Sequence, residues 1–380
     1  MKQPSNLEEI IALYNHAAPL AEARTIPAAW YINADVAALE RTSVFAHGWQ
    51  MVGRAEQVRN PGQYITADVA GEPVVVVRGA DYQLRAFYNV CRHHAAAVMT
   101  ELAGCAQQLR CPYHGWTYGL DGALKGMTEF EGVRDFDRAQ NGLVSVRVDT
   151  WESFVFVCLS GEAGNLAAHV GALAACVSPL NIGELHFSAQ RRWIIDCNWK
   201  VYVDNYLDGG YHVPHMHKGL NSVLNYSQYT IENIDRACIQ STPLRATSES
   251  DAAAATTRRG DYGYYFWLYP NFMINWYSGV MDTNLVLPRG SDQCEVVFDY
   301  YFQDVSPVAE KFARESIAVA DRVQEEDIAI CSSVQRGLQS SAYQAGRLSV
   351  RREAGEHLFH RLLHADLSRA ITSRNGDRNI

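Results

Sequence analysis

The chain has 380 residues, of which 48% are hydrophobic and 20% are charged, and its formal net charge is −9. This composition is typical of a globular protein with room for two domains, and the acidic balance argues against a nucleic-acid partner. Residues 1–20 lack the basic and apolar regions of a signal peptide, and no apolar run is long enough for a membrane helix, so we expect a cytoplasmic protein without membrane contact.

Short strands are predicted from about Phe45 to Ser160. Gly, Asn and Asp separate runs of alternating apolar residues, as in a small antiparallel β domain. The clearest runs are residues 63–67, 73–78, 84–89 and 154–158.

Two clusters of metal ligands lie within this β region. Cys91 and His93 form the first cluster, and Cys111 and His114 form the second, in the pattern C-x-H…C-x-x-H. Two thiolates on one iron and two imidazoles on the other describe a Rieske [2Fe–2S] cluster. Neutral imidazoles make reduction easier than thiolates do, so we expect a site that transfers single electrons.

Zinc is the alternative ligand for two Cys and two His. Zinc fingers usually place both Cys in one arm and both His in the other, whereas each arm here is mixed, which favours the iron–sulfur cluster. Residues 115–122, which follow the second arm, predict a strand and a tight turn. Cys105 has no His partner and is predicted to be a loop or core thiol, and the nine cysteines show no disulfide spacing.

After Gly161 the pattern changes to a mixture of helices and strands. Residues 165–176 are rich in Ala and Leu and predict a helix, whereas residues 252–255 are a short loop-like tract. Residues 308–337 are amphipathic with both signs of charge and predict one long helix. Strands are predicted at residues 187–197, 264–268, 280–287 and 295–302. An antiparallel sheet that grips a long helix is therefore expected after the β domain.

A second possible metal site lies in residues 207–217. One acidic residue and three imidazoles share this segment: Asp208, His212, His215 and His217. Two imidazoles and one carboxylate on one face of an iron ion form the facial triad of non-haem Fe(II) oxygenases. Spacing alone leaves His215 and His217 open as the partner of His212.

Pro214 suggests how this segment folds. Proline has no N–H group and clashes with the preceding helical turn. We therefore predict that a helix from about Trp199 ends near His212 and that the chain then turns back.

Aromatic side chains are concentrated in residues 264–277. A cage for a quaternary ammonium group would need such residues, although alternating strand residues face opposite sides and at most half can line one pocket. A neutral or anionic substrate, such as an acyl or polyketide chain or an aromatic ring, is collectively favoured over a quaternary ammonium compound. The aromatic residues are Tyr264, Tyr265, Phe266, Trp267, Tyr269, Phe272, Trp276 and Tyr277.

Three histidines near the C-terminus, His357, His360 and His364, have helical spacing. No Cys or well-placed acid completes a metal site with them, and Leu358 and Leu362 accompany them. We interpret this segment as an ordinary amphipathic terminal helix.

The chain resembles the catalytic (α) subunit of the Rieske non-haem iron oxygenases over nearly its whole length. The cluster motif continues through Gly115-Trp116. The iron motif comprises residues 198–200, 204–205 and 211–212, followed by His217. Within the family the chain is most similar to the choline monooxygenase-like group, in residues 204–208, 211–214, 217–218, 333–338, 342–343 and 346–347.

This resemblance implies the roles of particular residues. His212 and His217 are the implied imidazole ligands of the iron. The carboxylate ligand falls on Asp327, with Glu326 as the alternative, and Asn205 belongs to the implied catalytic machinery.

Three positions depart from the family pattern. His94 replaces an Arg that is common after the first cluster His, and His215 occupies a position that is often aromatic. Many relatives carry an electron-bridging acid three residues before the first iron His, where this chain has Gly209. Asp208 is our candidate for the bridging acid, with Asp204 as the alternative.

The resemblance also implies an α+β fold: an N-terminal antiparallel β Rieske domain and a helix-grip (START/Bet v 1-like) catalytic domain. The expected division is an N-terminal segment at 1–44 that packs on the catalytic domain, the Rieske domain at 45–160 and the catalytic domain at 161–380.

The implied cofactors are the [2Fe–2S] cluster and a mononuclear Fe(II), with O₂ as co-substrate. Because the chain shows no nucleotide-binding G-x-G-x-x-G motif, electrons from NAD(P)H would arrive through a separate flavin-containing reductase, with or without a ferredoxin.

We expect a homotrimer that hydroxylates a C–H bond of a small organic substrate, with monooxygenation favoured over dioxygenation. The non-enzymatic alternative is a Rieske electron carrier. Such a protein would have a far shorter chain without the possible iron site of residues 207–217.

Overall fold

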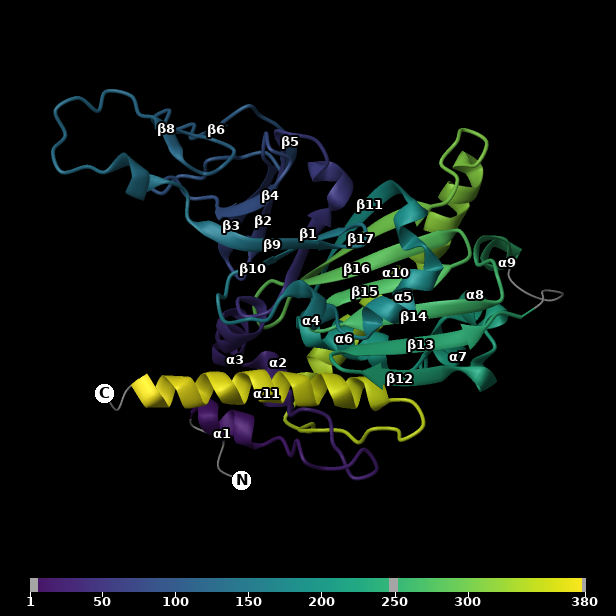
Figure 1. The fold of residues 1–380 in the computed structure, drawn as a ribbon. Coiled ribbons are helices and arrows are strands. Elements are labelled where there is room, and N and C mark those ends of the chain that lie inside the picture. The colour runs from purple at the N-terminus through teal and green to yellow at the C-terminus, as the bar shows by residue number, and fades with distance from the viewer. Residues whose placement is uncertain (1–5, 246–251, 378–380) are drawn as a thin grey trace. The chain divides into compact units, whose positions relative to one another are not determined.

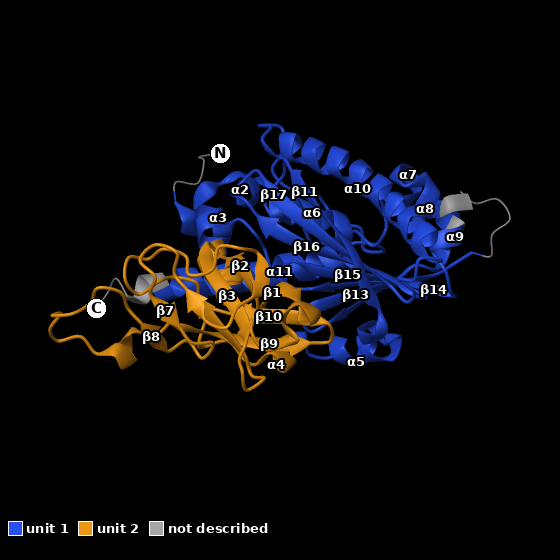
Figure 2. Cartoon of the chain, turned by 90° about the horizontal axis from the view of Figure 1, so that it is seen from above, with its two compact units in different colours: residues 1–40, 170–380 blue, residues 41–169 orange. Residues whose placement is uncertain are grey.

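The computed structural model of the protein describes residues 6–245 and 252–377. The chain divides into two compact units (Figure 2): residues 41–169 form one, and the segments before and after them form the other. Both units are built on antiparallel sheets, so the predicted α+β fold is confirmed. Across the described ranges, no helix combines the length and apolar character needed to cross a membrane.

The unit of residues 41–169 contains two sheets (Figure 1). A seven-stranded sheet has the order β1-β10-β9-β4-β3-β2-β5, and a three-stranded sheet has the order β6-β7-β8. The strands of the first are β1 (Gln50–Arg54), β2 (Gln63–Val69), β3 (Glu72–Arg78), β4 (Leu84–Tyr88), β5 (Ala103–Cys105), β9 (Ser145–Trp151) and β10 (Phe154–Cys158). The strands of the second are β6 (Leu109–Arg110), β7 (Thr117–Tyr118) and β8 (Leu124–Gly126).

Strand β3 shows why the smaller unit has two cores. Its four central residues are valines, and successive side chains of a strand point to opposite faces of the sheet. Val75 and Val77 pack into one core and the other two valines into a second. The core of Val75 and Val77 also contains Cys91 and Cys111, so apolar packing fixes both cysteines beneath the loops that follow them.

The other unit contains a seven-stranded sheet in the order β11-β17-β16-β15-β14-β13-β12. Its strands are β11 (His186–Ile195), β12 (Thr230–Ile234), β13 (Ala237–Pro243), β14 (Tyr262–Leu268), β15 (Phe272–Tyr277), β16 (Val280–Pro288) and β17 (Cys294–Phe302). Its helices include α1 (Leu7–Ala12), α2 (Ala28–Ile32), α3 (Ala34–Glu40), α6 (Trp199–Leu207), α7 (Val213–Met216), α8 (Lys218–Val223), α9 (Ala252–Thr257), α10 (Glu310–Leu338) and α11 (Ala354–Asp377).

Helix α10 is the predicted long helix, and it carries one buried face. Its buried positions recur every three or four residues from Ala313 to Leu338, which is the spacing of one side of an α-helix. Asp327 lies on this buried face. Helix α6 packs against α10, α11 and β16, which brings residues of α6 next to Asp327.

The predicted end of the helix that carries the first iron motif is wrong. Helix α6 ends at Leu207 rather than near His212. Gly209 and Gly210 have φ values of +66° and +67°, a left-handed conformation that ends helices. Pro214 lies in the first turn of the short helix α7, where its missing N–H would be unpaired in any case.

One further local prediction is refined by the structure and another is wrong. Residues 165–176 form two short helices, α4 (Leu166–Val170) and α5 (Leu173–Val177), because Gly171 between them has a φ of +58°. Residues 252–255 begin helix α9 instead of forming a loop, as expected from the high helix propensity of alanine.

Candidate active site

The structure brings His212, His217 and Asp327 together, although Asp327 lies on a different helix from the two imidazoles. Their ligand atoms lie within 4.8 Å of one another. The Nε2 atom of His217 is 3.2 Å from Oδ1 of Asp327, and the Nε2 atom of His212 is 3.9 Å from the same oxygen. Two imidazole nitrogens and a carboxylate oxygen therefore converge on one point, as a facial triad requires.

A second carboxylate holds the other nitrogen of each imidazole. The Nδ1 atom of His212 is 2.6 Å from Oδ2 of Asp208, and that of His217 is 2.5 Å from Oε2 of Glu326. Such pairs fix the ring orientation and the tautomer of a metal-binding His. Glu326 therefore lies on the far side of His217, and Asp327 is the carboxylate that faces both Nε2 atoms.

The unpaired atoms of this trio fit a bound cation. The Nε2 atom of His217 is buried and faces Oδ1 of Asp327 at 3.2 Å without a hydrogen bond of normal geometry, an arrangement that a cation bound between them would satisfy. Burial lowers the pKa of His217, but the close contacts and negative charges of Asp327 and Glu326 outweigh it and raise the pKa above its usual value. Carboxylates that attract a proton to this imidazole would equally attract Fe(II).

Asn205 positions the carboxylate of Asp327. Its Nδ2 atom donates a hydrogen bond of 2.9 Å to Oδ1 of Asp327. His215, which the spacing left open as a ligand, is exposed and does not belong to the converging group.

The backbone at Gly209 explains why the acid of this motif is Asp208. A Cβ atom at Gly209 would collide with the carbonyl oxygen of Arg352 and with Ile231, and the positive φ adds strain. Asp208 follows α6 directly, and its carboxylate accepts hydrogen bonds of 3.0 Å from the backbone N–H groups of Tyr211 and His212.

Asp204, the alternative bridging acid, has other partners. It accepts hydrogen bonds from the Tyr31 hydroxyl at 2.5 Å and from Nε2 of His360 at 3.0 Å. With Glu356 it forms a buried group around His360. The sequence did not predict that Asp204 lies beside His360, because the two residues are far apart in the chain. His357 and His364 are outside this group, so among the described residues no metal site that joins His360 and His364 is formed. His364 instead stacks on His16, with ring centroids 4.3 Å apart.

A cavity adjoins the converging trio and is lined by residues of the helices α6, α7, α8 and α10 and of the strands β13 to β17. The three proposed iron ligands line it. Of the eight aromatic residues predicted as a possible cage, two line the cavity, in keeping with strand alternation. The aromatic lining is Tyr202, Tyr206, Tyr229, Tyr265, Tyr277 and Phe298.

Sequence reasoning missed most of this lining. Tyr202 and Tyr206 come from α6, where they look like ordinary helix residues. The polar residues Arg258, Asp282 and Asn284 also line the cavity. Asp282, Thr283 and Asn284 interrupt an otherwise apolar strand, and this polar run is the signal that could have revealed a polar cavity.

The four predicted cluster ligands occupy two neighbouring loops of the smaller unit. Cys91 and Cys111 are buried, and burial raises the pKa of the Cys111 thiol. The rings of His93 and His114 lie 4.8 Å apart, and His93 stacks on Trp116 at 4.7 Å. The Nδ1 atom of His93 is buried without a hydrogen-bond partner, which fits an imidazole that binds a metal.

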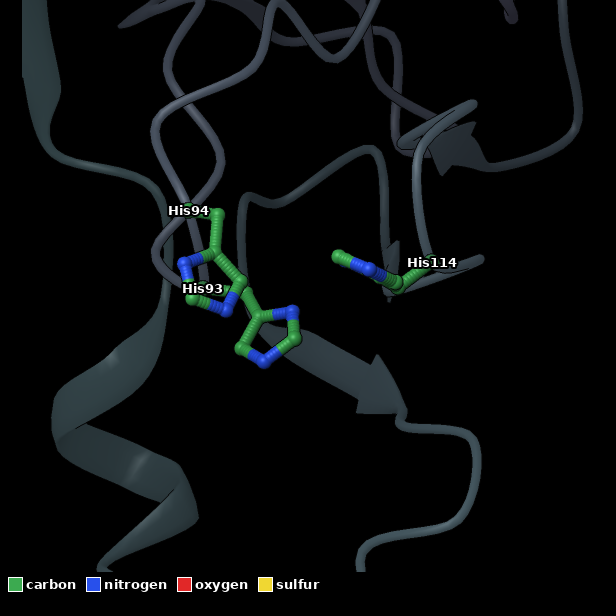
Figure 3. A group of neighbouring side chains, drawn as sticks. All are labelled: His93, His94 and His114. Carbon is green, nitrogen blue, oxygen red and sulfur yellow. The ribbon is translucent and has the colours of Figure 1, made fainter.

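His94 stands beside this pair. Figure 3 shows its ring next to His93, with 4.1 Å between the ring centroids. The ligand nitrogens of His93, His94 and His114 lie within 4.8 Å of one another. The sequence predicted only a change of charge at His94, because its contact with His114 depends on how the two loops meet.

Comparisons with known proteins match both parts of the chain in which the candidate sites lie. A family model described as "Rieske [2Fe-2S] domain" matches residues 48–137, and one described as "Ring hydroxylating alpha subunit (catalytic domain)" matches residues 182–368. The chain is 38% identical over 375 residues to a chloroplastic choline monooxygenase of Arabidopsis thaliana, covering 96% of this chain and 87% of that protein.

Two further relatives extend the comparison. The chain is 30% identical to the carnitine monooxygenase oxygenase subunit of Escherichia coli, covering 94% of this chain and 98% of that protein. A solved structure of a quaternary ammonium Rieske monooxygenase in complex with L-carnitine matches with a TM-score of 0.80 and 28% identity. That match covers 93% of this chain and 97% of the other.

Proposed function

The chain belongs to the Rieske non-haem iron oxygenases as a catalytic α subunit, and from this premise we propose that it hydroxylates a small quaternary ammonium compound. It is a monooxygenase whose cofactors are a Rieske [2Fe–2S] cluster and a mononuclear iron, with O₂ as co-substrate. A separate electron donor is required. The alternatives of a zinc module and of a bare electron carrier are removed by the two domain matches.

We assign the cofactor sites on the residues that fit them. Cys91, His93, Cys111 and His114 would hold the cluster, and His212, His217 and Asp327 would hold the iron. When bound, the two groups supply electron transfer and O₂ activation beside the substrate.

Two further residues support the iron site in this proposal. Asn205 keeps one oxygen of Asp327 turned toward the imidazoles through its 2.9 Å hydrogen bond. Asp208 holds His212 and offers a carboxylate route for electrons toward a cluster-binding imidazole. We further propose a flavin-containing reductase, with or without a ferredoxin, as the donor of electrons from NAD(P)H. A homotrimeric ring would place the cluster of one subunit near the iron of its neighbour.

The tyrosine-lined cavity beside the trio carries the substrate assignment. Tyr229 and Tyr265 are stacked with ring centroids 6.1 Å apart, and the ring of Tyr277 is nearly perpendicular to that of Tyr265. Burial raises the pKa values of Tyr229 and Tyr265 well above the usual range, so both remain neutral phenols. Neutral aromatic faces attract a cation that cannot donate hydrogen bonds. An acyl or polyketide chain would be better matched by a lining without buried charges.

The experiment is turnover with the purified iron-loaded protein, an NAD(P)H-dependent reductase and a panel of choline, glycine betaine, L-carnitine and γ-butyrobetaine. Hydroxylation of the chain carbon bonded to nitrogen yields an aldehyde and trimethylamine, and hydroxylation of an N-methyl group yields formaldehyde and the corresponding dimethylamine. Hydroxylation of an alcohol carbon yields an aldehyde that retains nitrogen. We expect one aldehyde product for each O₂ and each NAD(P)H consumed. Hydroxylation of aromatic or acyl substrates with no turnover of any member of the panel would contradict the proposal.

A further inference from the structure

Arg258 is a buried cation in the cavity that the proposed substrate would occupy. It follows helix α9 and is 8% exposed. Its Nη1 atom donates a hydrogen bond of 2.9 Å to Oγ of Ser316, and its guanidinium carbon lies 5.0 Å from the centre of the Tyr277 ring. Its Nε atom is buried without a partner. Among the described residues, no carboxylate oxygen lies within the 4.0 Å of an ion pair with this guanidinium.

An unpaired guanidinium is costly to bury, and one that lines a substrate cavity is suited to an anionic group of the substrate. Asp282 lines the same cavity but leaves Arg258 unpaired. Its carboxylate accepts a hydrogen bond of 2.7 Å from Nδ2 of Asn275. Burial raises the pKa of Asp282, and the positive charge of Arg258 and the hydrogen bond from Asn275 oppose this rise.

The amide groups of the cavity add a second, independent indication. Asn275 accepts a hydrogen bond from the Tyr206 hydroxyl and donates to both Asp282 and Asn284, so its orientation is fixed. Asn284 therefore turns its oxygen toward Asn275, and its Nδ2 atom is left buried without an acceptor. Two buried nitrogens of the cavity lining, Nε of Arg258 and Nδ2 of Asn284, are therefore donors without an acceptor, which is complementary to an acceptor group such as a carboxylate.

We infer that Arg258 selects the substrate by binding a carboxylate, so that the substrate is a zwitterion with a quaternary ammonium group at one end and a carboxylate at the other. This inference rests on the proposed function and narrows it. The tyrosine faces would hold the ammonium group, and Arg258 would hold the carboxylate. Choline, which has the cation without the anion, would place its positive charge in a cavity that already contains an unpaired guanidinium.

The test compares ligands that differ only in the anionic group. Calorimetry on the iron-loaded protein would measure the Kd of γ-butyrobetaine against its carboxamide, and of glycine betaine against choline. A charge-assisted pair with a buried guanidinium predicts that the better carboxylate ligand binds about 10- to 100-fold more tightly than its neutral counterpart.

Arg258→Gln should reduce this ratio to about twofold or less, by weakening the carboxylate ligand and not the neutral one. Arg259→Gln is the matched control, since Arg259 is the next residue, is exposed and lies over the Phe312 ring outside the cavity. It should keep the ratio of the unmodified protein. If Arg258→Gln does not fold, Arg258→Gln combined with Asp282→Asn removes both buried charges and should show the same loss of selectivity.

Two results would overturn the inference and leave the proposed function intact. One is choline or the carboxamide binding as tightly as the carboxylate ligand, with normal turnover. The other is Arg258→Gln weakening both members of a pair equally, which would indicate a structural role. Failure of every quaternary ammonium ligand to bind would instead overturn the proposed function, and this inference with it.

Discussion

Each imidazole of the proposed iron site is held between two carboxylates. His212 lies between Asp208 and Asp327, and His217 lies between Glu326 and Asp327. The outer carboxylate fixes the ring, and the inner one completes the metal site. This arrangement separates residues that bind iron from residues that only orient its ligands, so substitutions should separate them too.

His217→Ala and His212→Ala should each abolish binding of the mononuclear iron and all turnover. The visible spectrum and EPR signal of the Rieske cluster should stay unchanged, because the two sites use different residues. Metal analysis and spectroscopy of the purified variants measure this. His215→Ala is the control, since His215 is exposed. Retained iron and activity in His217→Ala, with loss of both in His215→Ala, would show that the ligand assignment is wrong.

Asp208→Asn should keep both metals and lose most of the turnover. The amide nearly preserves the shape of the Asp208 side chain, but it lacks the negatively charged oxygen that accepts the hydrogen bond from Nδ1–H of His212. Loss of such a partner typically costs about 10- to 100-fold in activity or metal affinity. Stopped-flow oxidation of the pre-reduced cluster, after addition of substrate and O₂, measures the electron-transfer step directly.

Asp204→Asn is the comparison for this prediction, because Asp204 is engaged with Tyr31 and His360. Normal cluster oxidation in Asp208→Asn together with slow oxidation in Asp204→Asn would move the bridge to Asp204. Normal oxidation in both variants would exclude a carboxylate bridge at either position.

At the scale of single elements, the segment after α6 decides where the ligands lie. The glycine pair ends the helix, and the close approach of the Arg352 carbonyl leaves no room for a side chain at Gly209. The acid then comes from the residue that directly follows α6, and α7 carries the chain to His217. The short break between α6 and α7 therefore turns the imidazoles of His212 and His217 toward α10, which one continuous helix could not do.

Gly209→Ala should destabilise the protein by about 1–3 kcal/mol, the usual cost of forcing a side chain into this backbone region, with the collision adding to it. Thermal or urea unfolding measures the loss. Gly337→Ala is the matched control, because nothing lies within 4 Å of a Cβ atom there and Gly337 is within helix α10. That variant should be unchanged or more stable by about 0.5–1 kcal/mol. Equal stability of Gly209→Ala and the unmodified protein would contradict the account of this turn.

Elements with a strong local pattern could be predicted from the sequence. The long helix and the main strands follow from apolar periodicity, which survives folding because burial enforces it. The end of α6 was predicted too late, although the glycine pair that follows Asp208 is a helix-stop signal. The contact between Gly209 and the Arg352 carbonyl, which requires glycine there, could not be predicted because the two residues are far apart in the sequence. The cavity lining could not be predicted either, since Arg258, Asp282 and Tyr229 lie far apart in the sequence and line one cavity only in the folded chain.

At the scale of the whole molecule, two metal sites lie in separate compact units, each with its own core. The proposed cluster ligands could be named from the sequence, because the short spacing within each of the two loops carries the information. The choice of His217 over His215 needed the family resemblance. The assignment of Asp327 needed the family resemblance, since it lies on a helix more than a hundred residues further along the chain.

The metal content of the purified protein should equal the sum of the two sites. The purified protein should contain about three iron and two acid-labile sulfide per chain, the sum of a [2Fe–2S] cluster and one further iron. Cys111→Ser should lose the sulfide and its absorbance while the unit that carries His212 stays folded. Stoichiometric zinc without labile sulfide would contradict the cluster assignment.

The most direct test of the central claim is a single turnover without any reductase. Protein with a reduced cluster and Fe(II) is mixed with O₂, with or without a quaternary ammonium substrate, while cluster absorbance and product are followed. We predict rapid cluster oxidation and an aldehyde product only when the substrate is present. Cluster oxidation at the same rate with and without every quaternary ammonium compound tested, and no hydroxylated product, would contradict the account.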